Sequence, residues 1–178
     1  MRRSRCLMVN HTPQHAAIDK VLATVMDPEL PCNIIDLGLV EQVAVDARAA
    51  TVKLIPTFTG CPALDMIADD VQRAVTELPE IDECTIEWLF EPAWSPDRIT
   101  DSGRASLRSH GVTVPEHGSP AMPADGTTPL RTSAIPCPWC GSTNTRLDSS
   151  FGPTRCRTIQ YCDDCQNTFE DMKRLKAD

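Results

Sequence analysis

The stretch FTGCPALDMIADDVQRAV, residues 58–75, places a cysteine directly before an amphipathic helix. Four apolar residues recur there at helical spacing and form one face of the predicted helix: Leu64, Ile67, Val71 and Val75. Pro62 suits the first position of a helix, because its missing N–H group is not needed there. The pattern therefore predicts a helix that starts next to Cys61 and packs its apolar face on a core.

Apolar spacing on both sides of this helix predicts a small sheet. A helix is expected over residues 15–26, a hairpin over 40–46 and 51–55, and a strand over 84–90 that buries Ile86, Trp88 and Phe90. One more helix is expected over 100–109, with Thr100 or Asp101 as its N-cap. The order helix, hairpin, helix, strand indicates an α+β domain in which helices back one small sheet.

Composition divides the chain into two unequal parts. A chain of 178 residues with 41% apolar content can bury one modest core and a small second unit. Residues 111–134 are rich in proline and glycine and carry almost no large apolar side chains, so they are predicted to be a linker. We expect a flexible N-terminus (1–14), an α+β domain (15–110), this linker, and a cysteine-rich module (135–178).

The net charge of -8 comes from the first part of the chain, where residues 1–99 hold 8 basic and 16 acidic side chains. Nucleic acids are bound mainly by clustered Lys and Arg, so this balance argues against a nucleic-acid partner. No segment is long and apolar enough to be expected to span a membrane. Residues 1–14 lack the apolar stretch of a signal peptide. A cytoplasmic location is therefore expected, with cysteines present as thiols or metal ligands.

Two C-x-x-C pairs, CPWC at 137–140 and CDDC at 162–165, are separated by 21 residues. This spacing is typical of a zinc ribbon, in which two tight turns direct four sulfurs at one tetrahedral ion. The predicted ligands are Cys137, Cys140, Cys162 and Cys165. An iron-sulfur cluster on the same four thiolates is the alternative. Phe151 and Phe169 are predicted to form the small apolar core of the ribbon.

Cys61 has two interpretations. The free N–H groups and positive dipole end at a helix start favour a thiolate, which predicts a lowered pKa and a reactive or metal-binding thiol. The alternative is a buried cysteine that fills a corner between helix and strand as a small apolar side chain.

Cys156 lies between the two predicted turns and is surplus to a four-ligand site. Its neighbours Arg155 and Arg157 favour a thiolate, so a second functional thiol is one interpretation and an ordinary hairpin residue is the other.

The remaining cysteines are assigned structural positions. Cys84 is predicted to lie in the core, because it alternates onto the same strand face as Ile86. Cys6 lies in the predicted flexible N-terminus. Cys32 precedes the segment NIIDLGLV in a loop from which it could approach Cys61.

Several sequence blocks resemble known families. The segments DPELP, NIIDLGLV and PTFTGCPALDM, within residues 27–66, resemble the domain shared by bacterial SufT-type proteins and eukaryotic factors of cytosolic iron-sulfur assembly. The segments EPAWSPDRITDSGRASLRSHGV, CPWCGS, SSFGPTRC and CDDCQNTFEDMK resemble the PaaD family of accessory components of the phenylacetyl-CoA epoxidase system. Together the blocks span most of residues 15–174.

The resemblance implies a non-catalytic role in maturing or inserting an iron-sulfur or di-iron centre of the phenylacetyl-CoA epoxidase of phenylacetate catabolism. The family's motif cysteine falls on Cys61, and the cysteine of its FG-x-T-x-C segment falls on Cys156. Asp36 and Thr59 are predicted as supporting residues, and the alternative for Asp36 is a structural role in which its side chain caps a turn. Cys32 stands where the family often has an apolar residue, so no function is carried onto it.

The cofactors implied are a structural zinc ion in the ribbon and a transient iron ion or iron-sulfur cluster. The implied partners are subunits of a multicomponent phenylacetyl-CoA monooxygenase or iron-sulfur assembly proteins.

Two other functions compete with this assignment. A thiol-dependent enzyme could use Cys61 as its nucleophile, but the four histidines (His11, His15, His110 and His117) lie in tail, helix-start or linker contexts that make a paired base improbable. A nucleic-acid-binding zinc ribbon would need a basic face, yet residues 135–178 carry no net charge. The sequence also lacks the His-carboxylate pairs of a di-iron oxygenase, a phosphate-binding glycine loop and a dinucleotide fingerprint.

Overall fold

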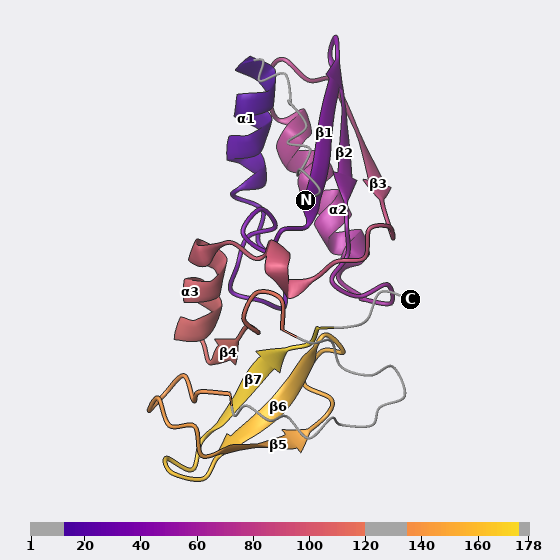
Figure 1. The fold of residues 1–178 in the computed structure, drawn as a ribbon. Helices are drawn as coiled ribbons and strands as arrows, with labels where there is room; N and C mark the ends of the chain where they lie inside the picture. The colour runs from indigo at the N-terminus through magenta and orange to yellow at the C-terminus, as the bar shows by residue number, and fades with distance from the viewer. Residues whose placement is uncertain (1–12, 120–134, 175–178) are drawn as a thin grey trace, which may run out of the picture.

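The computed structural model describes residues 13–119 and 135–174, which form an α+β unit and a β-ribbon (Figure 1). The α+β unit contains α1 (Pro13–Leu22), β1 (Val40–Asp46), β2 (Ala49–Leu54), α2 (Leu64–Thr76) and β3 (Glu83–Trp88). The predicted order helix, hairpin, helix, strand and the predicted fold class are confirmed.

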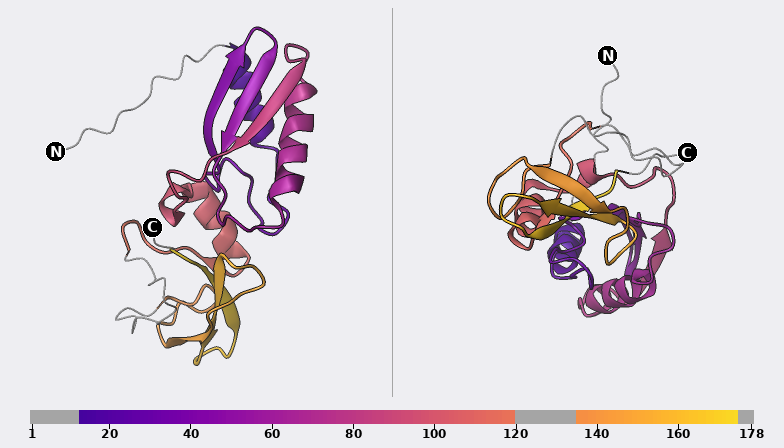
Figure 2. Two further views of the ribbon diagram at one scale, coloured as in Figure 1. Left: turned by 90° about the vertical axis from the view of Figure 1, so that its right-hand side faces the viewer. Right: turned by 90° about the horizontal axis from the view of Figure 1, so that it is seen from below.

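The sheet of this unit has the strand order β1-β2-β3, with β1 antiparallel and β3 parallel to β2. The parallel pair requires a crossover, which α2 provides. Both α1 and α2 cover the same face of the sheet (Figure 2). Toward them β2 buries Ala50, Val52 and Leu54, while α2 buries Ile67, Val71 and Val75. The alternate residues of β2 and the apolar face of α2 therefore pack together in one core, as the sequence predicts.

Two aromatic residues differ from expectation. Phe90 is 55% exposed, because β3 ends at Trp88 and the alternation that would bury residue 90 stops there. Phe151 is 69% exposed and lies beneath the ammonium group of Lys173 instead of entering the ribbon core. Phe169 is buried, so that part of the prediction is confirmed.

The turn at Asp36–Gly38 holds the segment that follows β3. Gly38 adopts φ +68°, a left-handed conformation that favours glycine. Backbone oxygens of this turn accept hydrogen bonds from Trp94 Nε1 (at Leu37, 3.0 Å), Arg98 Nε (at Gly38, 2.7 Å) and the Thr100 N–H group (at Asp36, 3.0 Å). These bonds fix the short 3-10 helix η1 (Pro96–Arg98) and the start of α3 (Asp101–Ser109).

The N-cap of α3 is Thr100, one of the two residues predicted for this position. Its hydroxyl oxygen accepts from the Gly103 N–H group at 3.0 Å, and the hydroxyl donates to the Asp36 carboxylate at 2.5 Å. Asp36 therefore joins the turn to the helix cap, which is a structural role.

The ribbon contains β5 (Thr145–Ser149), β6 (Arg157–Cys162) and β7 (Thr168–Met172), which are antiparallel. A further strand, β4 (Val112–Thr113), runs parallel to β7 and gives the order β4-β7-β6-β5. The first nine residues of the predicted linker, 111–119, are therefore part of the described structure. Residues 111–119 are structured because β4 pairs with an otherwise open edge of β7. Three segments lie outside the described residues. They are residues 1–12 of the predicted N-terminus, which include Cys6, residues 120–134 of the predicted linker, and residues 175–178.

The ribbon is packed against the α+β unit, with α3 and β4 between them (Figure 1). Cys156 and Met172 of the ribbon belong to the same cluster of buried apolar residues as the core of the α+β unit. Arg174 forms a two-pronged ion pair with the Asp97 carboxylate, which holds the pKa of Asp97 well below its usual range. The shared core and shared sheet place residues from both units beside one another.

Candidate functional site

The four predicted ribbon cysteines come together. The sulfurs of Cys137, Cys140, Cys162 and Cys165 lie within 4.8 Å of one another. Cys137 and Cys165 are 3.7 Å apart, and Cys140 and Cys162 are 3.6 Å apart. Four thiolates bound to one tetrahedral ion at about 2.3 Å would be separated by about 3.8 Å. The spacing fits a single ion better than a cluster, which distributes its thiolate ligands over several iron atoms.

Two similar turns produce this convergence. Gly141 N–H donates to the carbonyl of Cys137, and Gln166 N–H donates to that of Cys162, each at 2.9 Å. Both donors have positive φ, +77° at Gly141 and +59° at Gln166. Each turn bends the chain so that its two sulfurs point to the same place.

A second location with cysteines lies at the junction of the two units. A cavity of about 200 Å³ is lined by Glu29, Phe58 and Cys61 from the α+β unit and by Thr154, Arg155 and Cys156 from the ribbon, among others. The sequence marked Cys61 and Cys156 as separate candidates, 95 residues apart along the chain. The tertiary structure brings them to one cavity.

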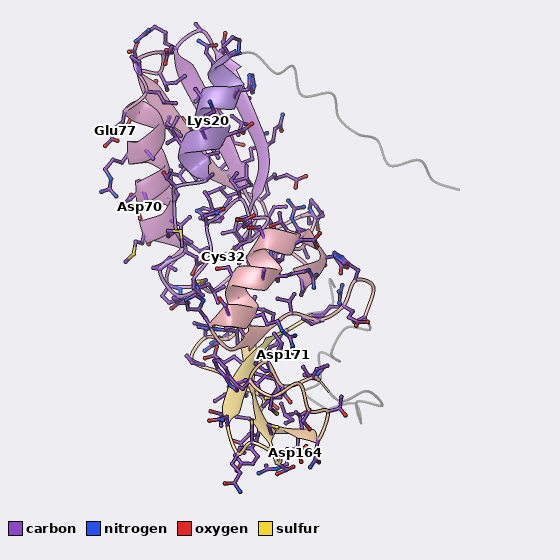
Figure 3. The ribbon with its side chains drawn as sticks, turned by 90° about the vertical axis from the view of Figure 1, so that its left-hand side faces the viewer. Lys20, Cys32, Asp70, Glu77, Asp164 and Asp171 are labelled. Carbon is purple, nitrogen blue, oxygen red and sulfur yellow. The ribbon has the colours of Figure 1, made fainter. Side chains whose placement is uncertain are left out.

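This cavity is distinct from the ribbon cluster. In Figure 3, Asp164, which belongs to the CDDC turn, lies at the far end of the ribbon, whereas Asp171 of β7 lies near the α+β unit. The four-cysteine cluster thus lies at the end of the ribbon away from the α+β unit, and the junction cavity lies where the ribbon meets that unit.

The predicted lowering of the Cys61 pKa is wrong. α2 begins at Leu64 with Ala63 as its N-cap, so Cys61 lies two residues before the cap. Burial raises the pKa of Cys61, and the carboxylates of Glu29 and Asp27 raise it further, while a hydrogen bond from the Ala63 N–H group opposes them. The helix start therefore contributes one amide, which burial and nearby negative charge outweigh.

Alkylation should report this raised pKa. In the metal-free junction, the rate of iodoacetamide modification at Cys61 is expected to rise with pH through a midpoint above that of an unperturbed cysteine, because the thiolate is the reactive form. Peptide mass spectrometry can follow Cys61 separately from the other thiols. A midpoint below that of free cysteine would contradict this prediction and restore the activated-nucleophile interpretation.

The segment FGPTRC holds Cys156 in place. Gly152 N–H donates to the carbonyl of Arg157 at 2.9 Å, which closes the loop. Arg157 Nε donates to Thr154 Oγ1 at 2.7 Å, and Thr154 Oγ1 is 3.1 Å from Cys156 Sγ. Since a guanidinium group only donates, the threonine oxygen accepts from Arg157 and its hydroxyl proton is available to the sulfur. Cys156, only 7% exposed, is therefore oriented by a hydrogen bond.

The two thiols have opposite electrostatic surroundings. Cys61 faces the carboxylates of Asp27 and Glu29, whereas Cys156 lies near the ammonium group of Lys173. Lys173 Nζ donates to the Arg155 carbonyl at 2.9 Å, and burial lowers its pKa, an effect that Cys156 opposes. Cys61 therefore lies near negative charge and Cys156 lies near positive charge.

Other candidate residues do not line the cavity. Asp36 is occupied at the α3 cap, and Thr59 is exposed. Cys32 and Cys84 are buried in the core, where desolvation raises the pKa of each to about 11. The core position predicted for Cys84 is confirmed. Glu29 was not predicted, although it lies in the DPELP block.

Two family descriptions match the chain. Residues 15–88 match an iron-sulfur cluster assembly protein family, and residues 121–173 match the PaaD zinc beta ribbon domain. An Escherichia coli K12 protein, named as a subunit of 1,2-phenylacetyl-CoA epoxidase, is 31% identical over 164 residues, covering 90% of this chain and 93% of its own. The chain belongs to the PaaD family.

The first unit of this PaaD-family protein also occurs in shorter proteins. The Fe-S protein maturation auxiliary factor SufT of Staphylococcus aureus is 36% identical over 84 residues, covering 47% of this chain and 96% of its own. A crystal structure of a domain of unknown function, DUF59, from Bacillus anthracis matches 53% of this chain and 94% of its own with a TM-score of 0.50 and 32% identity. The predicted resemblance to both families is confirmed.

Within residues 13–119 and 135–174, no helix has the length and apolar character needed to cross a membrane.

Proposed function

We propose that this protein is a non-catalytic accessory factor that helps to mature or insert a metal centre of a phenylacetyl-CoA epoxidase. Its PaaD-family membership and the SufT-like relatives of its first unit support this role. The partners would be subunits of that multicomponent monooxygenase or iron-sulfur assembly proteins in the cytoplasm. The metal centre of the epoxidase is the cargo or the product of this maturation step and is not a cofactor of this protein.

We assign zinc to the ribbon as a structural ion. The sulfur spacing suits one tetrahedral ion, and thiolates are preferred ligands of zinc. Within the described part of the ribbon, the buried apolar cluster at the site consists of Phe169 and two of the ligands, Cys137 and Cys162, which is too small to hold the fold by itself. Binding of the ion therefore supplies much of the free energy that folds the ribbon.

The observation that carries the proposed function is the position of Cys61 at the junction cavity. Its thiol is partly exposed, so an iron ion or a cluster held by a partner could reach it. Among the described residues, no histidine lines the cavity, and the raised pKa of Cys61 does not favour a nucleophilic enzyme. A partly accessible soft ligand without a paired base suits transient metal contact better than covalent catalysis.

The test is co-production of the epoxidase subunits in cells that contain this chain, lack it, or contain Cys61→Ser. We expect the oxygenase purified with the unaltered chain to carry more iron and more ring-epoxidising activity than oxygenase made without it, and Cys61→Ser to resemble the absence of the chain. Cys84→Ala, which removes a buried thiol of the same unit that does not line the cavity, is the matched control. If the oxygenase has equal iron content and equal activity whether or not the chain is present, the proposal is wrong.

A further inference from the structure

The junction cavity combines ligands from both units. Cys61 comes from the turn before α2, and Cys156 comes from the residue before β6. Both line the same cavity, and each thiolate would affect the charge of the other, since Cys156 contributes to raising the pKa of Cys61. The carboxylate of Glu29 lines the same space.

We propose that Cys61 and Cys156 form a second metal site, which binds one thiophilic divalent cation between the assembly unit and the ribbon. Binding replaces the two S–H protons with two sulfur-metal bonds and releases two protons to solvent. Glu29 supplies negative charge to the same space, and the other coordination positions are open to water or to a ligand of the partner. This inference deepens the proposed function by naming the cargo as a soft cation and its second ligand as Cys156.

The donor set determines the kind of ion. Two thiolates select soft or borderline ions such as Fe²⁺ and Zn²⁺ over Mg²⁺ or Ca²⁺, which prefer oxygen ligands. A volume of about 200 Å³ corresponds to roughly six water molecules, which is enough for an ion that keeps part of its hydration. The carboxylates of Asp27 and Glu29 near Cys61 offset the positive charges of Arg155 in the lining and of Lys173 near Cys156, so the two thiols determine the preference for a cation.

The site is incomplete within this chain. Among the described residues, the ribbon cysteines alone form a preassembled group of three or more metal-binding side chains. Two thiols with one carboxylate nearby leave coordination positions unfilled, so the ion would be held less tightly than the ribbon ion. A site that needs another ligand to be completed is suited to passing its ion to a partner.

A cobalt titration of the full chain tests the inference. The protein is reduced, kept without oxygen and loaded with one equivalent of Zn²⁺, which Co²⁺ does not readily displace from thiolates. We expect a further equivalent of Co²⁺ to bind, with sulfur-to-cobalt charge-transfer absorption and release of two protons. Cys61→Ser and Cys156→Ala should each weaken this binding at least tenfold, and Glu29→Gln should weaken it severalfold.

Cys84→Ala is the matched control, because it removes a buried thiol of the same unit that does not line the cavity. The Cys84→Ala variant should still bind the equivalent of Co²⁺ in addition to its zinc ion. The inference is overturned if no second equivalent binds, or if it binds equally well to Cys61→Ser and Cys156→Ala. Should Cys156→Ala lose its zinc by unfolding the ribbon, Cys61→Ser at its partly exposed position and the two-proton count in the unaltered protein still decide.

The experiments distinguish a failure of the proposed maturation function from a failure of the proposed second metal site. Cobalt binding that needs both thiols, together with normal oxygenase maturation by Cys61→Ser in cells, would establish the site and refute its proposed use. Loss of maturation by Cys61→Ser without a second bound ion would support the function and refute the two-thiol site.

Discussion

Cys162→Ser is expected to release the ribbon metal ion and to unfold β5, β6 and β7. Cys162 is fully buried, is 3.6 Å from Cys140, and belongs to the small apolar cluster of the ribbon. Structural zinc sites contribute on the order of 10 kcal/mol of binding free energy, which is folding free energy when the apolar core is small. Bound zinc should fall from about one equivalent to none, and amide exchange in these strands should become rapid.

The helices provide an internal reference for this experiment, because α1, α2 and α3 all lie outside the ribbon. Their circular dichroism signal should largely remain. Cys84→Ala serves as the control, since it removes a buried thiol remote from the ribbon cluster and should keep the zinc equivalent. Protected amides in β6 of metal-free Cys162→Ser would show that the ribbon folds without its ion.

Gly38→Ala is expected to destabilise the α+β unit by roughly 3 kcal/mol or more. A Cβ atom at this position would lie 2.5 Å from the Cβ and the carbonyl oxygen of Arg98, and φ is +68°. The atoms it would meet belong largely to the backbone of η1, which the Asp36–Gly38 turn itself holds by hydrogen bonds. The clash therefore cannot be relieved by a simple side-chain rotation. Chemical denaturation followed by helical circular dichroism measures the loss.

Gly118→Ala separates the two sources of this effect. Gly118 has almost the same backbone angle, φ +72°, but a Cβ atom there would have nothing within 4 Å. It should therefore show only the conformational cost of a left-handed alanine, about 1 kcal/mol. Equal losses for Gly38→Ala and Gly118→Ala would mean that the contact with Arg98 contributes nothing.

Local patterns explain why much of the fold was predictable. The face of α2 follows from the spacing of Ile67, Val71 and Val75, and the α3 cap follows from Thr100 before an acidic first turn. The ribbon ligands follow from two C-x-x-C pairs, since each turn is built from contiguous residues. In each case the information lies within a few residues of the chain.

Three predictions fail at places where residues distant in the sequence come into contact. Pro62 suggested a helix that starts beside Cys61, but the pKa of that thiol depends on burial and on carboxylates at 27 and 29. The predicted linker hid β4, because two residues beside a β7 edge have no pattern of their own. Phe151 was assigned to a core by its apolarity alone, although it lies exposed beneath Lys173.

The sequence by itself determined the family, the order of the elements and the four-sulfur ribbon site, because contiguous motifs and regular spacings encode each of them. Only the tertiary structure decided that Cys61 and Cys156 share a cavity, that the charges near the two thiols differ, and that the Asp36 carboxylate binds the cap of α3. Burial and electrostatic potential are sums over groups that are distant in the chain, so no local pattern contains them.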